Sequence, residues 1–170
     1  MGTRGLIMNI IYDGFRQNTP SWDESFMWMA VLVSKRSKDP STQNGGVVVN
    51  DKNVVIGTGY NGWPRGIEAW EFPWDRDAVD LMNTKYFYVV HAEENAIYNA
   101  SMSVTGCKIY CTLHPCNECA KTIIQTGIIE VIFEEDRGGS IFDAAKLLFI
   151  KAGIKTRQYK RKLSLEEFFK

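Results

Sequence analysis

The sequence carries no net charge, because 20 lysines and arginines balance 20 aspartates and glutamates. Proteins that hold a polynucleotide by its phosphates usually have a basic surplus, so this balance disfavours DNA or RNA as a partner. A ligand with one phosphate is not excluded, since it needs only one or two cations. We expect a protein without a polynucleotide partner.

Long hydrophobic runs are also missing. No apolar stretch approaches the ~18 residues of a membrane span, and the segment 6–11, "LIMNII", is too short and too polar-flanked for a signal peptide. We therefore expect a cytoplasmic protein with no membrane partner. In a reducing compartment, a Cys-x-x-Cys pair indicates a metal or redox site rather than a disulfide.

Repeats and low-complexity segments are absent, and 45% of the 170 residues are hydrophobic. This length and composition predict one domain over residues 1–170. Residues 1–20 lack periodicity and are interpreted as an N-terminal arm. Residues 66–87 form a long connector, and loops of that length are usually functional or disordered.

The remaining chain alternates between helical and extended patterns. Ser21 and Glu24 form a capping-box signal for a helix over 22–36, and two strands flank the turn Asn50-Asp51-Lys52. Helices are then expected near 92–102, 116–126 and 142–151, with strands at 108–113, 130–135 and 155–159, and a last capped turn from Ser164. The pattern predicts an α/β fold: a three-layer α/β/α sandwich around a mixed sheet of about five strands.

Histidine is the scarcest chemistry-bearing residue, and its placement is informative. The two histidines are His91 in "VHAEENAI" (90–97) and His114 in "LHPCNECA" (113–120), and the second stretch also holds two of the four cysteines. Both stretches are expected at helix starts that follow strands, where ligands collect in such sheets.

Cys116 and Cys119 lie about one helical turn apart, so both sulfurs can reach one ion. The helix N-terminus favours thiolate over thiol, and thiolate and neutral imidazole are good zinc ligands. With His91 as the third ligand, the fourth tetrahedral position stays open, as catalytic zinc requires. Water bound there has its pKa lowered toward ~7.

Such a site needs a proton shuttle, and two carboxylates follow His91. Glu93 lies two residues on and Glu94 three residues on. Helical periodicity favours Glu94, because positions i and i+3 share a helix face. The choice depends on whether His91 is itself helical, and spacing alone leaves both residues open.

The two stretches together match a known signature. "HAEENAI" followed by "PCNECA" is the H-x-E…P-C-x-x-C pattern of zinc-dependent nucleoside and nucleotide deaminases. "RSKDPSTQ", "GYNGWPRG", "NTKYFYVVHAEENAI", "LHPCNECAKTIIQTGI" and "EVIFEED" extend the match, so that residues 26–159 resemble the deoxycytidylate deaminase family. The resemblance implies a cytidine deaminase-like fold and hydrolysis of dCMP to dUMP for thymidylate synthesis.

The resemblance also implies residue roles. His91, Cys116 and Cys119 would hold Zn²⁺, and Glu93 would protonate N3 of cytosine and then the departing ammonia. The family is commonly hexameric, activated by dCTP and inhibited by dTTP with Mg²⁺. Substrate contacts are expected from Asn61, Asn95, Ala92 and Pro115, and phosphate contacts from Arg36, Lys38 and Ser41. The resemblance places the effector site around residues 62–65 and the connector 66–87, with contacts from Gly62, Arg65 and Lys85.

Other interpretations stay open at this point. The chain could deaminate another cytosine nucleotide such as dCTP, or a polynucleotide base, or could be a non-enzymatic zinc-stabilised nucleotide sensor. A closed structural zinc knuckle would instead use Cys111, His114, Cys116 and Cys119. The chain also departs from the family pattern at Asn44, where an apolar residue is usual. A second departure is Arg137-Gly138-Gly139-Ser140, where relatives often carry an aromatic residue.

Overall fold

The computed structural model describes residue 14 and residues 19–169, so the predicted N-terminal arm lies almost entirely outside the described residues. Five strands form one mixed sheet in the order β2-β1-β3-β4-β5. The strands are β1 (Gly45–Val49), β2 (Val55–Tyr60), β3 (Lys108–Leu113), β4 (Glu130–Glu135) and β5 (Lys155–Gln158). Strand β1 is antiparallel to β2 and β3, whereas β3, β4 and β5 run parallel to one another.

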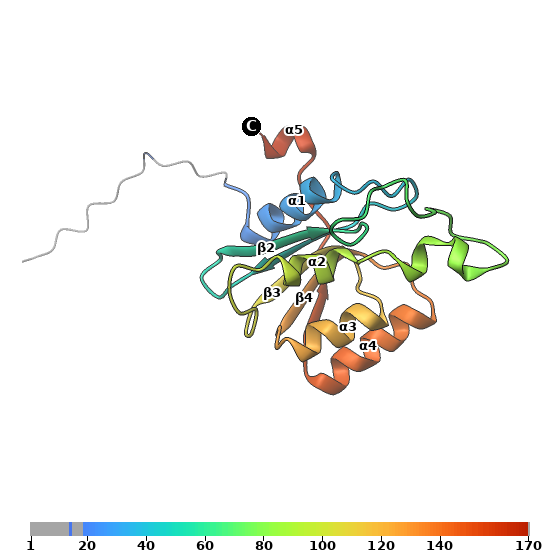
Figure 1. Ribbon diagram of the computed structural model, residues 1–170. Coiled ribbons are helices and arrows are strands. Elements are labelled where there is room, and N and C mark those ends of the chain that lie inside the picture. Colours follow the sequence, from blue (N-terminus) through green and yellow to red (C-terminus); the bar gives the residue numbers. More distant parts are fainter. Residues whose placement is uncertain (1–13, 15–18, 170) are drawn as a thin grey trace, which may run out of the picture.

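Helices cover both faces of this sheet (Figure 1). They are α1 (Trp22–Ser34), α2 (Ala92–Tyr98), α3 (Asn117–Gln125), α4 (Ser140–Ala152) and the short α5 (Leu165–Phe168). Helix α1 lies on one face, and α2, α3 and α4 lie on the other. This arrangement confirms the predicted three-layer α/β/α sandwich. Among the described residues, no helix is both long and apolar enough to span a bilayer.

The alternation of side chains along β1 builds the two halves of the core. Val47 and Val49 pack with Phe26 and Met27 of α1, whereas Val48 packs on the opposite side with Ile109 and the α2–α4 layer. Successive strand residues point to opposite faces, so a fully apolar strand serves both layers. All five residues of β1 are buried.

Close backbone approach positions α2 against β2. A Cβ atom at Gly59 would overlap the backbone of Ala92 and Ala96, so only glycine lets the helix lie this near the strand. Two asparagine side chains then tie the helix to the strand: Asn95 Nδ2 donates to Tyr60 O at 2.8 Å, and Asn99 Nδ2 donates to Thr58 O at 2.9 Å. Helix α2 is thereby held with its N-terminus at the end of β2.

Two expectations around α2 were wrong. The segment before His91 is not a sheet strand, because Val90 forms only an isolated bridge with Gly62. The helix ends at Tyr98 rather than near residue 102, since the backbone N–H of Ser101 instead donates to Ile56 O at 2.9 Å on β2. The connector preceding it holds two short 3₁₀ turns, η1 (Leu81–Asn83) and η2 (Lys85–Phe87).

Candidate active site

Three side chains converge where the first turns of α2 and α3 meet. His91 is the N-cap of α2, Cys116 is the N-cap of α3, and Cys119 lies one turn into α3. The Nδ1 atom of His91 lies 3.2 Å from Cys119 Sγ and 3.4 Å from Cys116 Sγ, and the three ligand atoms all lie within 4.8 Å of one another. Tetrahedral zinc with ordinary bond lengths would separate nitrogen and sulfur by ~3.5 Å. The donor set and its spacing therefore fit zinc.

The three side chains lie close enough to shift one another's pKa values. Hydrogen bonds from the Cys119 thiol and then from His91 lower the pKa of Cys116 to about 3, despite its burial. The contact with Cys116 raises the pKa of His91 to about 9 and the pKa of Cys119 well above its usual value. Metal ligation requires thiolate sulfurs and a neutral imidazole, so a bound cation would release the protons that these three groups hold.

The alternative zinc knuckle is wrong. Cys111 is buried in the core between the sheet and α2–α4, and His114 Nδ1 donates to Pro115 O at 2.8 Å while its ring packs edge-on against Phe133. Over the described part of the chain, the one group suited to hold a metal is His91, Cys116 and Cys119. Three protein ligands leave a fourth tetrahedral position for solvent or substrate.

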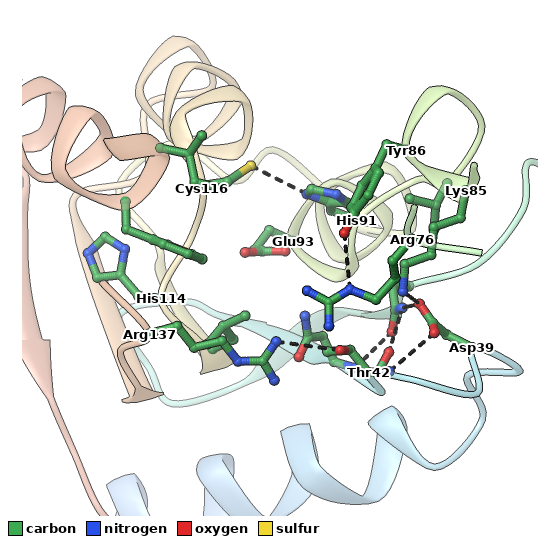
Figure 2. A pocket seen from close by; sticks show the side chains of 16 residues that line it. Asp39, Thr42, Arg76, Lys85, Tyr86, His91, Glu93, His114, Cys116 and Arg137 are labelled. Carbon is green, nitrogen blue, oxygen red and sulfur yellow. Dashed lines mark hydrogen bonds and ion pairs between the residues drawn. The ribbon is translucent and has the colours of Figure 1, made fainter. Parts of the chain in front are cut away.

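The conformation of His91 distinguishes the two neighbouring carboxylates. His91 has φ −74° and ψ 159°, so it is extended and the helical i to i+3 argument does not apply to it. Glu94 turns back to cap the helix, accepting from the His91 backbone N–H at 3.5 Å. Glu93 is only 6% exposed and instead lines a cavity together with His91 and Cys116 (Figure 2). Burial raises the pKa of the Glu93 carboxyl above its usual value.

The cavity beside the metal trio has a volume of about 330 Å³. Its walls come from segments far apart in the sequence: the loop before β1, the end of β2, the connector, and the loop between β4 and α4. The residues that matter below are Thr42, Asn61, Arg76, Lys85, Tyr86 and Arg137. A small polar molecule entering this cavity would meet Glu93 and the metal trio together.

A buried carboxylate organises the wall opposite the metal trio. Asp39 Oδ2 accepts from Lys85 Nζ at 2.5 Å and from Asn61 Nδ2 at 3.2 Å, and its Oδ1 accepts from Ser41 and Thr42. Burial would raise the pKa of Asp39, but these donors outweigh it and the pKa is lowered. Asp39 thereby ties the connector and the end of β2 to the loop before β1.

Asn61 is held rigidly by the same loop. Its Oδ1 accepts from the backbone N–H of Asn44 at 2.7 Å, and its Nδ2 also donates to Thr42 O at 2.9 Å. Asn44 thus contributes through its backbone and lines the cavity. Asn61 itself is buried at the cavity wall.

The structure brings only some of the predicted site residues together. Asn61, Lys85, His91, Glu93 and Cys116 line the cavity, and Ser41 borders it through its hydrogen bond from Lys85. Ala92, Pro115 and Cys119 are buried directly behind this wall.

The other predicted residues lie outside the cavity. Arg36, Lys38 and Gly62 line a separate hollow of about 120 Å³ with Trp63 and Trp74. Arg65 hydrogen-bonds Asn99, and Asn95 is committed to Tyr60. Trp63 and Trp74 stack on each other with ring centroids 4.0 Å apart, so Trp63 packs against the connector, whereas Trp70 is 78% exposed.

Several cavity residues were not assigned to the site from sequence, among them Asp39, Thr42, Arg76, Tyr86 and Arg137. Arg137 follows β4, and residues just beyond the carboxyl end of a parallel strand commonly contact ligands, so that position was a usable signal. Arg76 and Tyr86 lie in a connector without periodicity, and no sequence pattern pointed to them. The fold alone brings them to the metal trio.

Comparisons with known proteins agree with this site. A family model described as "Cytidine and deoxycytidylate deaminase zinc-binding region" matches residues 20–135. Deoxycytidylate deaminases of Mus musculus and Homo sapiens are 49% and 48% identical over 152 residues, covering 88% of this chain and 85% of theirs. The structure of dCMP deaminase from cyanophage S-TIM5 in complex with dCMP and dUMP is 26% identical, covers 84% of this chain and 99% of that one, and gives a TM-score of 0.67. The chain therefore belongs to the cytidine and deoxycytidylate deaminase family, whose zinc-binding region contains the His91, Cys116 and Cys119 trio.

Proposed function

We propose that this protein catalyses the hydrolytic deamination of dCMP to dUMP. The observation that carries the proposal is the convergence of the metal trio and the buried Glu93 carboxyl on one cavity. Relatives about half identical to the chain are named deoxycytidylate deaminases, and the phage dCMP deaminase was solved with dCMP and dUMP. Water is consumed, the C4–N bond breaks, and ammonia leaves.

The proposed roles follow from the positions of the side chains. His91, Cys116 and Cys119 would hold a zinc ion, which when bound would lower the pKa of a water molecule in the open fourth position. Glu93 accepts the proton that this water loses, delivers it to N3 of the cytosine ring, and later protonates the departing amino group. Its raised pKa matches this exchange, because the carboxyl must be both acceptor and donor near neutral pH.

The surrounding residues hold the nucleotide in place. Asn61, fixed by Asp39 and Asn44, is positioned to contact the sugar or base through the free lone pair of its Oδ1. Ala92 and Pro115 contribute backbone next to the metal ligands.

The experiment that tests this function is ammonia release from dCMP by zinc-loaded protein, with dCTP and single-stranded DNA as competing substrates. Glu93→Gln should retain zinc and fold but lose on the order of 10²–10⁴-fold in kcat, because general acid–base catalysis contributes about that much. Glu94→Gln is the matched control, since Glu94 caps α2 outside the cavity, and it should keep most of the activity. Activity retained by Glu93→Gln and lost by Glu94→Gln would contradict the assignment.

We also propose regulation by nucleotides, with dCTP activating and dTTP plus Mg²⁺ inhibiting. The support is the second hollow, where the cations Arg36 and Lys38 lie beside Gly62 and the stacked Trp63 and Trp74. Arg65 lies on the loop that borders this hollow, whereas Lys85 lines the catalytic cavity. Measuring the dCMP rate with each nucleotide, with and without Mg²⁺, tests the proposal, and an unchanged rate would refute regulation without touching the chemistry.

A homohexameric assembly in the cytoplasm is the remaining part of the proposal. Leu32 of α1 and Leu147 and Ile150 of α4 are each more than half exposed, and such side chains are typical of subunit contacts. The cytoplasm would keep the Cys116 and Cys119 thiols reduced for metal binding. Light scattering with size-exclusion chromatography tests the assembly, and a monomer at micromolar concentration would contradict it.

A further inference from the structure

Two guanidinium groups point into the cavity from different walls. Arg76 comes from the connector, and Arg137 comes from the loop between β4 and α4 (Figure 2). Both side chains are exposed at the mouth of the cavity, and both line it together with Glu93. Each arginine is always cationic and carries five N–H donors.

In the described part of the chain, neither guanidinium is paired with a carboxylate. Among the ion pairs of the described residues, none includes Arg76 or Arg137. The Nε atom of Arg76 donates to Tyr86 Oη at 3.2 Å, and an Nη atom of Arg137 donates to Thr42 Oγ1 at 3.4 Å. Each of these bonds uses one donor, so most donors of both groups stay available.

The acidic residues that line the cavity, Asp39 and Glu93, do not form close ion pairs with the two arginines. Asp39 already accepts hydrogen bonds from Lys85, Asn61, Ser41 and Thr42. Among the described residues, Glu93 forms no ion pair with either guanidinium. Two like charges facing one cavity repel each other unless an anion lies between them. The arrangement therefore points to an anionic ligand group.

The local structure prepares Arg76 for this role. The backbone N–H of Lys85 donates to Asp75 O at 3.0 Å, next to Arg76, and the Lys85 side chain is pinned to Asp39. The hydrogen bond between Lys85 and Asp75 joins the two ends of the loop 75–86. The hydrogen bond to Tyr86 orients the Arg76 guanidinium. A guanidinium held in place loses less freedom when it binds, and its planar fork matches phosphate oxygens.

We propose that Arg76 and Arg137 together bind the 5′-phosphate of the nucleotide substrate, with Tyr86 and Thr42 holding the two guanidiniums. This rests on the proposed function and adds to it the residues that distinguish a nucleotide from a nucleoside. The cavity then has two ends: the metal trio and Glu93 take the pyrimidine ring, and the arginine pair at the mouth takes the phosphate. Arg36 and Lys38, in the separate hollow, do not take part.

The test compares a nucleotide with the same nucleoside, using zinc-loaded full-length protein. Dissociation constants for dUMP and 2′-deoxyuridine are measured by calorimetry for the wild type, Arg76→Met, Arg76→Lys and Arg137→Met. Lys52→Met, in the exposed turn between β1 and β2, is the control for loss of one positive charge. Arg76→Met and Arg137→Met should each weaken dUMP binding on the order of 10- to 100-fold, the range for a charge-assisted hydrogen-bonded contact.

The nucleoside separates phosphate recognition from a general loss of structure. Deoxyuridine binding should be unchanged in all variants, and Arg76→Lys should fall between wild type and Arg76→Met, because lysine keeps the charge but not the fork. An Arg76→Met protein that binds dUMP normally, or that loses dUMP and deoxyuridine equally, overturns the inference. Binding is measured without turnover, so a protein that shows this phosphate dependence yet releases no ammonia from dCMP would refute the proposed function and leave the arginine pair standing.

Discussion

Replacing Lys85 by methionine should destabilise the protein strongly, because it breaks a buried ion pair on one side only. The side chains of Lys85 and Asp39 are 6% and 1% exposed, and their charged atoms lie 2.5 Å apart. Methionine matches most of the lysine stem, so packing changes little. Asp39 stays buried with its hydrogen bonds from Ser41, Thr42 and Asn61 but without its counter-ion.

The magnitude follows from the burial of the pair. At an effective dielectric constant of ~20, two unit charges at this separation attract by roughly 6–7 kcal/mol. Desolvation of both ions offsets much of that attraction in the intact pair, but losing one partner leaves the desolvation of the other uncompensated. We therefore expect Lys85→Met to lower the free energy of unfolding by about 3–5 kcal/mol. For a chain of this size, that corresponds to a Tm lower by roughly 6–20 °C.

A double-mutant cycle measures the coupling free energy between Lys85 and Asp39 from urea unfolding, at fixed protein and saturating zinc concentrations. Asp39→Asn removes the charge from the other side, and the two substitutions should couple by about 1–3 kcal/mol because they share one interaction. Lys52→Met is again the surface control and should change stability by less than about 0.5 kcal/mol. The reasoning would be refuted if Lys85→Met lowered the free energy of unfolding by less than ~1 kcal/mol. It would also be refuted if the effects of Lys85→Met and Asp39→Asn on that free energy simply added.

Two further predictions concern the C-terminal segment and the contact between α2 and β2. Buried Glu24 accepts from Tyr159 Oη at 2.7 Å and from the backbone N–H groups of Lys162 and Leu163. Glu24→Gln should therefore cost about 2–4 kcal/mol by urea unfolding at pH 7. In the wild type the pKa of Glu24 is lowered, because burial raises it but the hydrogen-bond donors outweigh burial. The loss of unfolding free energy in Glu24→Gln should therefore be full above about pH 4.5 and shrink as the pH falls. A loss that does not change with pH would contradict this. Gly59→Ala should lower Tm, because its Cβ would overlap the backbone of α2.

The elements that could be predicted are those whose signals are local. Ser21 caps α1 as its sequence indicates, accepting from the Glu24 N–H at 3.1 Å, and Ser164 with Glu167 caps α5 in the same way. Strand β1 was predicted because three consecutive valines precede the turn Asn50-Asp51-Lys52, and the structure buries all five of its residues. The metal trio was predicted because Cys116 and Cys119 are one helical turn apart and His91 belongs to a short linear motif.

What could not be predicted depends on contacts between distant segments. The conformation of the connector is set by the pairing of Lys85 with Asp39 and by aromatic contacts such as Phe72 on Tyr88, whose ring centroids lie 4.2 Å apart. No periodic pattern encodes either contact. For the same reason, the sequence placed the phosphate cations on Arg36 and Lys38, whereas the cavity presents Arg76 and Arg137. Residue spacing left Glu93 and Glu94 both open and the family resemblance implied Glu93, whereas the physical reason, the extended backbone of His91, is visible only in the structure.

The measurement that tests the central claim most directly is the zinc content and zinc coordination of zinc-replete protein, by elemental analysis and X-ray absorption. The account predicts one zinc per chain, bound to two sulfurs, one imidazole nitrogen and one solvent oxygen, in both wild type and Glu93→Gln. Cys116→Ala should lose the metal and ammonia release together. Protein without stoichiometric zinc, or zinc whose fourth ligand is another side chain, would contradict the account.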